Sequence, residues 1–139
     1  SLRHIGQPDV TTGIEALRHI FAGTMKWNLW LFMIRRSLIE GLGASPFLPG
    51  VNMGEDLMLM GKLLHGASFV SIVHLPLYTY VRSDQQITNV YRPEHWAQVE
   101  INVRELESYL AARTSVQEQE LLHFLKLNLK LPLLISTRR

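Results

Sequence analysis

The chain contains no cysteine and only three aspartates, Asp9, Asp56 and Asp84, in 139 residues. Without cysteine it can form neither a disulfide bond nor a thiolate metal site, and a cytosolic setting fits better than a secreted one. No two aspartates are separated by a single residue, so there is no Asp-x-Asp metal clamp. His-Glu-x-x-His, Gly-x-Ser-x-Gly and phosphate-binding glycine motifs are also missing. We therefore do not expect a self-contained hydrolase, kinase or dehydrogenase.

Charged residues are sparse as well. They make up 19% of the chain, below the roughly 25% that is usual in a soluble domain, so we expect part of the surface to be covered. The net charge is only +2 and the basic residues are scattered, which argues against nucleic-acid binding. No run approaches the roughly 20 apolar residues of a membrane-spanning helix. The chain starts at Ser1, in a polar segment, which indicates a piece of a longer protein.

Capping signals and helical spacing of apolar residues predict most of the chain as helix. The first expected helix is opened by Thr11 or Thr12 with Glu15 and ended by Gly23, and a helical turn over 37–41 is capped by Ser37. A third helix covers 55–65 and is closed by Gly66, and a fourth runs from Pro93 to about Ala112. The last is capped by Thr114 or Ser115 with Glu118 and is interrupted at Pro132.

Three segments are predicted as short strands. Residues 68–74 alternate and are rich in β-branched side chains, and 77–82 follow after Pro76. The apolar run within 27–36 fits a buried strand or a buried helix, and we favour the strand. The expected fold class is thus α+β, mostly helical with a few short strands. With no βαβ alternation, either the domain is α+β or part of its sheet lies in a missing segment.

An ordered set of motifs carries the functional signal. It consists of Trp30 followed by Ile34-Arg35-Arg36, then Phe47-Leu48-Pro49-Gly50, then Gly54-Glu55-Asp56, then Leu77-Tyr78-Thr79-Tyr80-Val81-Arg82. This order and spacing, over roughly residues 12–90, resembles the C-terminal half of bacterial family 2 glycosyltransferases of the GT-A fold. In that family the Trp30 segment often reads Trp-Asn-Lys, whereas Leu31 and Phe32 follow Trp30 here.

The resemblance implies the C-terminal part of a GT-A (nucleotide-diphospho-sugar transferase) fold that lacks its nucleotide-binding half. Residues 1–90 would form the acceptor side, and 91–139 a helical extension. The implied activity is inverting sugar transfer to an acceptor hydroxyl in polysaccharide or glycolipid synthesis. Asp56 would be the general base, a role usually worth about 10²–10⁴ in rate. Glu55 would orient the acceptor or Asp56, Arg82 would meet the donor diphosphate, and Trp30 would stack on a sugar.

The same resemblance implies the partners. These are a nucleotide-sugar donor and a glycan or lipid-linked acceptor, in the cytoplasm or at the inner face of the membrane. No metal site is expected in this chain, but a divalent Mg or Mn ion is expected in the full-length enzyme. The 139 residues alone should transfer no sugar.

Simpler interpretations stay open at this point. Acidic residues such as Glu55 and Asp56 are common in a first helical turn, because they interact favourably with the helix dipole. Trp30 also fits a core residue, and Arg82 a solvated one. The chain as a whole also fits a non-catalytic helical interaction module, or a peripheral membrane-binding module that uses the apolar run 121–135. An unpaired sheet edge leaves self-association open.

Overall fold

The computed structural model describes residues 8–43, 45–79, 81, 93–111, 113 and 115–136, with the side chains of 93 and 127–136 outside the description. This part of the chain contains five α-helices and one 3-10 turn. They are α1 (Gly13–Phe21), η1 (Leu29–Leu31), α2 (Arg36–Glu40), α3 (Glu55–Gly66), α4 (Pro93–Ala111) and α5 (Val116–Ser136).

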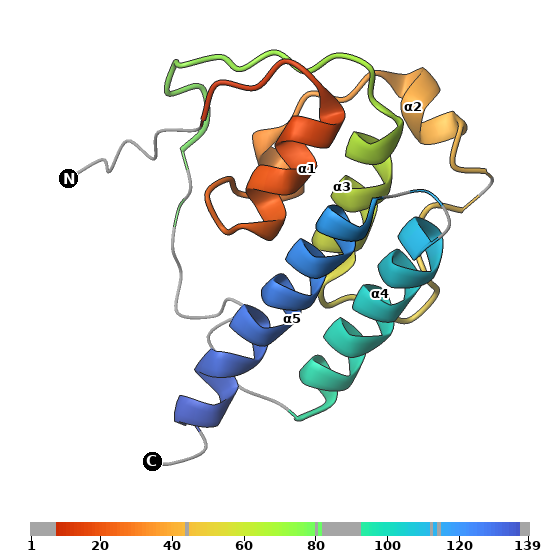
Figure 1. Cartoon of the computed structure of the whole chain (residues 1–139), viewed down its shortest axis with the longest axis vertical. Coiled ribbons are helices and arrows are strands. Elements are labelled where there is room, and N and C mark those ends of the chain that lie inside the picture. Colours follow the sequence, from red (N-terminus) through yellow and green to blue (C-terminus); the bar gives the residue numbers. More distant parts are fainter. Residues whose placement is uncertain are drawn as a thin grey trace.

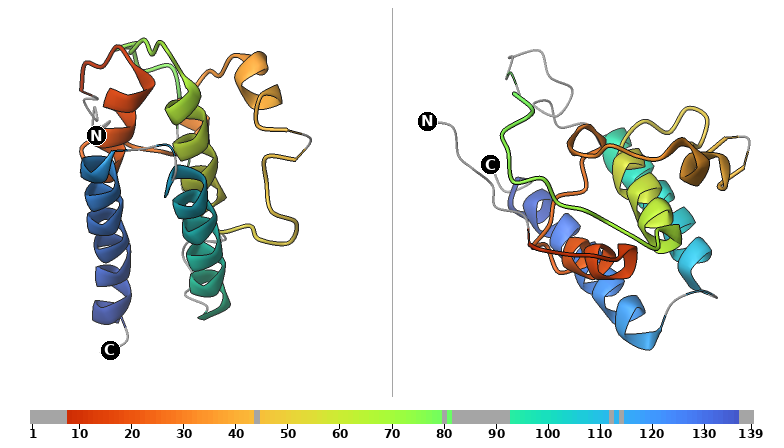
Figure 2. Two further views of the ribbon diagram at one scale, coloured as in Figure 1. Left: turned by 45° about the vertical axis from the view of Figure 1, so that its right-hand side comes forward. Right: turned by 90° about the horizontal axis from the view of Figure 1, so that it is seen from above.

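The helices form two adjoining pairs. α1 packs on α5 and α3 packs on α4, while α1–α3 and α4–α5 contacts join the pairs (Figure 1). The left view of Figure 2 shows α1 and α5 on one side of the molecule and α3 and α4 on the other. Short α2 packs on α3 and, with its connecting loops, stands to one side of the other helices (Figure 2).

α3 is the central helix of the core. Seven of its twelve residues are buried, in agreement with the prediction of a helix that is covered on most sides. Two glycines allow its neighbours to come close. A Cβ on Gly13 would lie 1.9 Å from the backbone oxygen of Leu64, and one on Gly61 would lie 2.6 Å from Leu106 Cδ1. The absence of a side chain at Gly13 and at Gly61 therefore lets α1 and α4 pack closely against α3.

The helix boundaries largely follow the capping signals. Thr12 and Glu15 form the expected capping box of α1, and Ser115 and Glu118 exchange the matching bonds at the start of α5. Two details of the prediction are wrong. Ser37 lies inside α2, whose N-cap is Arg35 without a side-chain bond. α5 also continues through Pro132 to Ser136 instead of being interrupted there.

The predicted α+β fold class is wrong for the described residues. None of them is in a strand, so the mixed sheet of a GT-A fold is not found there. The segment 27–36 contains η1 and a short extended stretch instead of a strand, and residues 68–74 and 77–79 are irregular. A strand is defined by its ladder of hydrogen bonds, and alternating side chains do not supply the neighbouring strand that the ladder needs.

Candidate functional site

The site predicted around Gly54, Glu55 and Asp56 lies at the first turn of α3. Gly54 has φ +82° and ψ 3°, a left-handed conformation that favours glycine. A Cβ at this position would also lie 3.2 Å from Val99 Cα on α4. Two independent constraints therefore require glycine here, and together they set the angle at which the chain enters α3.

The loop before this glycine is held by side chains from α4. Gln98 Oε1 accepts a hydrogen bond from the backbone N–H of Asn52 at 2.8 Å, and Asn102 Nδ2 donates to the backbone oxygen of Met53 at 2.8 Å. Asn102 is fully buried, and its Oδ1 has no hydrogen-bond partner among the described residues. The start of α3 is thus fixed from the α4 side by two amide side chains.

Asp56 is held by a segment that precedes it in the sequence, whereas the α4 side chains come from a segment that follows it. Its Oδ2 accepts a hydrogen bond from the backbone N–H of Leu29, the first residue of η1, at 3.1 Å. One carboxylate oxygen is therefore occupied by a main-chain donor. Residue 56 as a whole is half-buried. This bond joins the Trp30 segment to the Glu-Asp pair.

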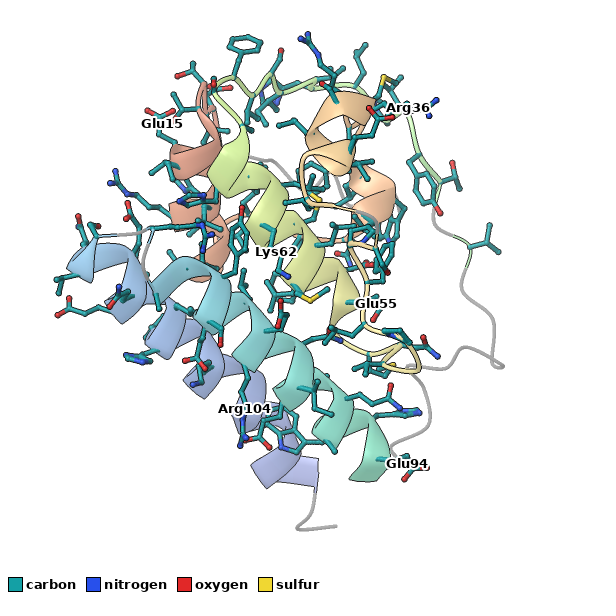
Figure 3. All side chains as sticks on the ribbon, turned by 90° about the vertical axis from the view of Figure 1, so that its right-hand side faces the viewer. Glu15, Arg36, Glu55, Lys62, Glu94 and Arg104 are labelled. Carbon is teal, nitrogen blue, oxygen red and sulfur yellow. The ribbon has the colours of Figure 1, made fainter. Side chains whose placement is uncertain are left out.

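Glu55 is the more perturbed of the two acids. Burial raises the pKa of its carboxyl above the ordinary value of 4.5, partly opposed by a bond from its own backbone N–H, and the neighbouring charge of Asp56 raises the pKa further. Figure 3 shows Glu55 at the start of α3, with Lys62 further along the same helix. A carboxyl that gives up its proton less readily than usual sits beside the proposed base.

Trp30 packs against Tyr78 rather than in the core. The two rings are stacked, with centroids 4.7 Å apart and planes at 24°. Both side chains are substantially exposed, Trp30 at 40% and Tyr78 at 53%. Because Trp30 directly follows Leu29, the stack is linked through one peptide bond to the donor that holds Asp56. Aromatic faces at this exposure are the surfaces on which sugar rings can pack.

The structure leaves two predicted features undecided. Arg82 and Tyr80 lie outside the described residues. Within the described part of the chain, no three His, Asp or Glu side chains are grouped so that they can hold a metal ion. The divalent ion implied by the resemblance therefore has no ligand set in the part of the chain that the structure covers.

The prediction missed Leu29, Gln98 and Asn102, which position the acidic pair. The contribution of Leu29 is a backbone N–H, which no side-chain motif can reveal. Asn102 gave a weak signal, since an amide stands close to the apolar positions Val99, Val103 and Leu106 of the predicted helix stripe. A polar residue next to a buried stripe usually marks a specific hydrogen bond.

Comparison of the chain with protein-family models gave no match, and the comparisons with curated proteins and with solved structures gave none either. No helix in the described ranges is both long enough and apolar enough to cross a membrane.

Proposed function

We propose that this chain supplies the acceptor-binding and general-base part of an inverting glycosyltransferase, with Asp56 as the base. The observation that carries the proposal is the Asp56–Leu29 hydrogen bond of 3.1 Å, which orients a carboxylate of a half-buried residue against the residue that precedes Trp30, one ring of the exposed Trp30–Tyr78 stack. A general base needs a fixed carboxylate, and a sugar acceptor needs an aromatic surface on which to rest.

In the proposed reaction, the acceptor sugar packs on the Trp30–Tyr78 stack and its hydroxyl faces Asp56. As the hydroxyl oxygen attacks the anomeric carbon of the donor, Asp56 takes its proton, the bond to the nucleoside diphosphate breaks and the configuration inverts. The Leu29 N–H keeps Oδ2 in place and leaves Oδ1 for the proton. Glu55, with its raised pKa, stays next to the base and positions it.

The described residues do not fit a metal site, so no step of this reaction is assigned to a divalent ion. The donor diphosphate also needs residues other than those at the start of α3. The proposal accordingly assigns this chain the acceptor side, and a separate donor-binding part of the protein the nucleotide-sugar.

One observation favours a competing interpretation, in which Asp56 has a purely structural role. Its hydrogen bond to Leu29 ties η1 to α3, and a helix-stabilising carboxylate would make the same bond. The chain would then be a non-catalytic interaction module. The two interpretations differ in the chemistry they require: the structural role needs only a hydrogen-bond acceptor, whereas the catalytic role needs a proton acceptor.

Saccharide binding by this chain tests the acceptor site directly. In titrations with a panel of neutral mono- and disaccharides, we expect NMR shifts in the Trp30 and Tyr78 resonances that saturate at millimolar concentration. Trp30→Ala should abolish these shifts. Phe124→Ala is the matched control, because Phe124 is an aromatic residue on α5 with a similar exposure of 51%. If no saccharide shifts these resonances, or if Trp30→Ala and Phe124→Ala behave alike, the acceptor assignment is wrong.

A further inference from the structure

Residues 67–74 run antiparallel to residues 9–13. The backbone N–H of Gly13 donates to Ala67 oxygen at 3.0 Å, and Val70 N–H donates to Thr11 oxygen at 2.8 Å. His74 Nε2 lies 2.8 Å from Asp9 Oδ1, further along the same pair of segments. Figure 1 shows the two segments, green and red, passing together over the end of the helical layer. One edge of segment 67–74 is therefore occupied by residues 9–13.

The other edge has no backbone partner among the described residues. In an extended chain, the N–H and C=O of one residue point to the same edge, and those of the next residue point to the opposite edge. Because Val70 faces residues 9–13, the groups of Phe69, Ser71 and Val73 face away. No backbone hydrogen bond involves these three residues within the described part of the chain. Unpaired groups in a row are a template for an added strand.

The side chains along this free edge are apolar and exposed. Exposure alternates from residue 69 to residue 73, and the inward-facing Val70 and Ile72 pack against the core. No charged residue occurs from 66 to 79, and the large exposed apolar side chains are Phe69 at 74%, Val73 at 59%, Leu75 at 64% and Leu77 at 75%.

The order of residues identifies the partner. Read outward from Ser71, the pairs are Val70 with Ile72, Phe69 with Val73, Ser68 with His74 and Ala67 with Leu75. Apolar residues match apolar residues and polar match polar at each step, so the polarity pattern is the same in both directions. We propose that residues 69–73 are a homodimerisation edge, which pairs antiparallel with the same segment of a second copy about a two-fold axis at Ser71.

This arrangement satisfies the requirements of a symmetric interface. A two-fold axis sets each residue against its partner twice, so Phe69 packs on Val73 of the second copy in two equivalent places. Aromatic and β-branched residues opposite one another are favourable cross-strand pairs. Because residues 66–79 include no Asp, Glu, Lys or Arg, pairing about the two-fold axis places no such charges of like sign opposite each other. Pairing also supplies partners to the unpaired backbone groups of both copies and continues the contact with residues 9–13 into a four-segment layer.

Cysteine crosslinking tests the register, and the cysteine-free chain makes the test clean. In Ser71→Cys the new thiol would face its own copy across the axis, at the Cα separation of about 5.5 Å that suits a disulfide. We expect Ser71→Cys to form a disulfide-linked dimer in air, about tenfold or more faster than Ser37→Cys, since pairing raises the effective thiol concentration to millimolar. Ser37 is an equally exposed serine on α2 and serves as the control.

Ser71→Lys provides the second readout, by placing two ammonium groups opposite each other at the axis. By sedimentation velocity at tens of micromolar, we expect the wild-type chain to be a dimer and Ser71→Lys a monomer. Their helical circular dichroism should be equal, because Ser71 is exposed. A monomeric wild-type chain overturns the proposal. So does a dimer that survives Ser71→Lys, or one in which Ser71→Cys crosslinks no faster than Ser37→Cys, since either result places the contact on another surface.

Discussion

The side chain of Asp56 accepts a hydrogen bond from the backbone N–H of Leu29, 27 residues earlier in the chain, at 3.1 Å. This contact fixes η1 against the first turn of α3 and brings Trp30 into the neighbourhood of the acidic pair. The carboxylate is therefore held both by its own helix and by a distant loop. The proposed function depends on this double restraint, because a base must keep its orientation when the acceptor binds.

Gly54 is the residue whose substitution should disturb this arrangement most. Gly54→Ala forces a side chain into a left-handed conformation, at about 1–2 kcal/mol. It also places a Cβ 3.2 Å from Val99 Cα, and overpacking of this kind adds about 1–3 kcal/mol. Urea unfolding, followed by the helical circular dichroism signal, measures the loss in the free energy of unfolding.

Gly50→Ala is the matched control for that substitution. Gly50 has a similar φ of +74°, but nothing lies within 4 Å of the position of its Cβ. It should show the conformational cost and no steric cost. An equal loss in the free energy of unfolding for the two variants would mean that the close contact with Val99 on α4 adds no cost at Gly54. The path of the chain into α3 would then be set by the preceding loop alone.

The ion pair between Arg18 and Glu118 joins α1 to α5 and should matter for stability. Glu118 Oε1 accepts bonds from Arg18 Nε at 3.0 Å and from Nη2 at 2.8 Å, while the Glu118 side chain is only 6% exposed. Arg18→Ala leaves that buried carboxylate without its cation, and we expect a loss of about 1–3 kcal/mol in the free energy of unfolding.

The surface pair Arg36–Glu40 is the comparison for Arg18→Ala. Its two side chains are 90% and 60% exposed, although its 2.7 Å separation is no longer than that of the buried pair. Exposed pairs typically contribute about 0–1 kcal/mol. A chemical denaturation curve for Arg36→Ala that shifts as far as the one for Arg18→Ala would show that burial of Glu118 has no special weight.

The contribution of Glu118 to the free energy of unfolding should also be lost at acid pH. Bonds from the Ser115 hydroxyl and backbone N–H and from Arg18 hold the pKa of Glu118 below its ordinary value of 4.5, against the opposing effect of burial. The unfolded state therefore takes up a proton first as the pH falls, so this stabilisation is complete above 4.5 and is lost as the pH drops through the lower, folded pKa. The melting temperature of Glu118→Gln should fall less between pH 7 and acid than that of the wild type.

Much of the helical architecture could be predicted, because its signals are local. The capping boxes Thr12–Glu15 and Ser115–Glu118, each four residues long, identify the starts of α1 and α5. Gly54 and Gly66 mark the two ends of α3. Position 93 likewise begins α4, as the first-turn preference of proline predicts. Each of these features is decided by neighbouring residues, so the sequence alone suffices.

The predicted strands failed for a non-local reason. Exposure alternates from residue 69 to residue 73, so the side-chain pattern that predicted a strand is present although the strand is not. A strand also needs a partner, however, and only Val70 forms a backbone bond to the adjacent segment, at Thr11. The same limit applies at the site. Asp56 and Glu55 could be selected from their motif, but the Leu29 donor, the Asn102 clamp and the Trp30–Tyr78 stack depend on the folded chain.

The most direct measurement is the rate of sugar transfer by Asp56→Asn in the complete, donor-binding glycosyltransferase that the proposal requires. Asparagine keeps an oxygen that can accept from Leu29 N–H but cannot take the acceptor proton. Nucleoside diphosphate release should therefore fall by about 10²–10⁴ with an unchanged unfolding midpoint. Transfer by Asp56→Asn at close to the wild-type rate would contradict the account and leave Asp56 with a structural role alone.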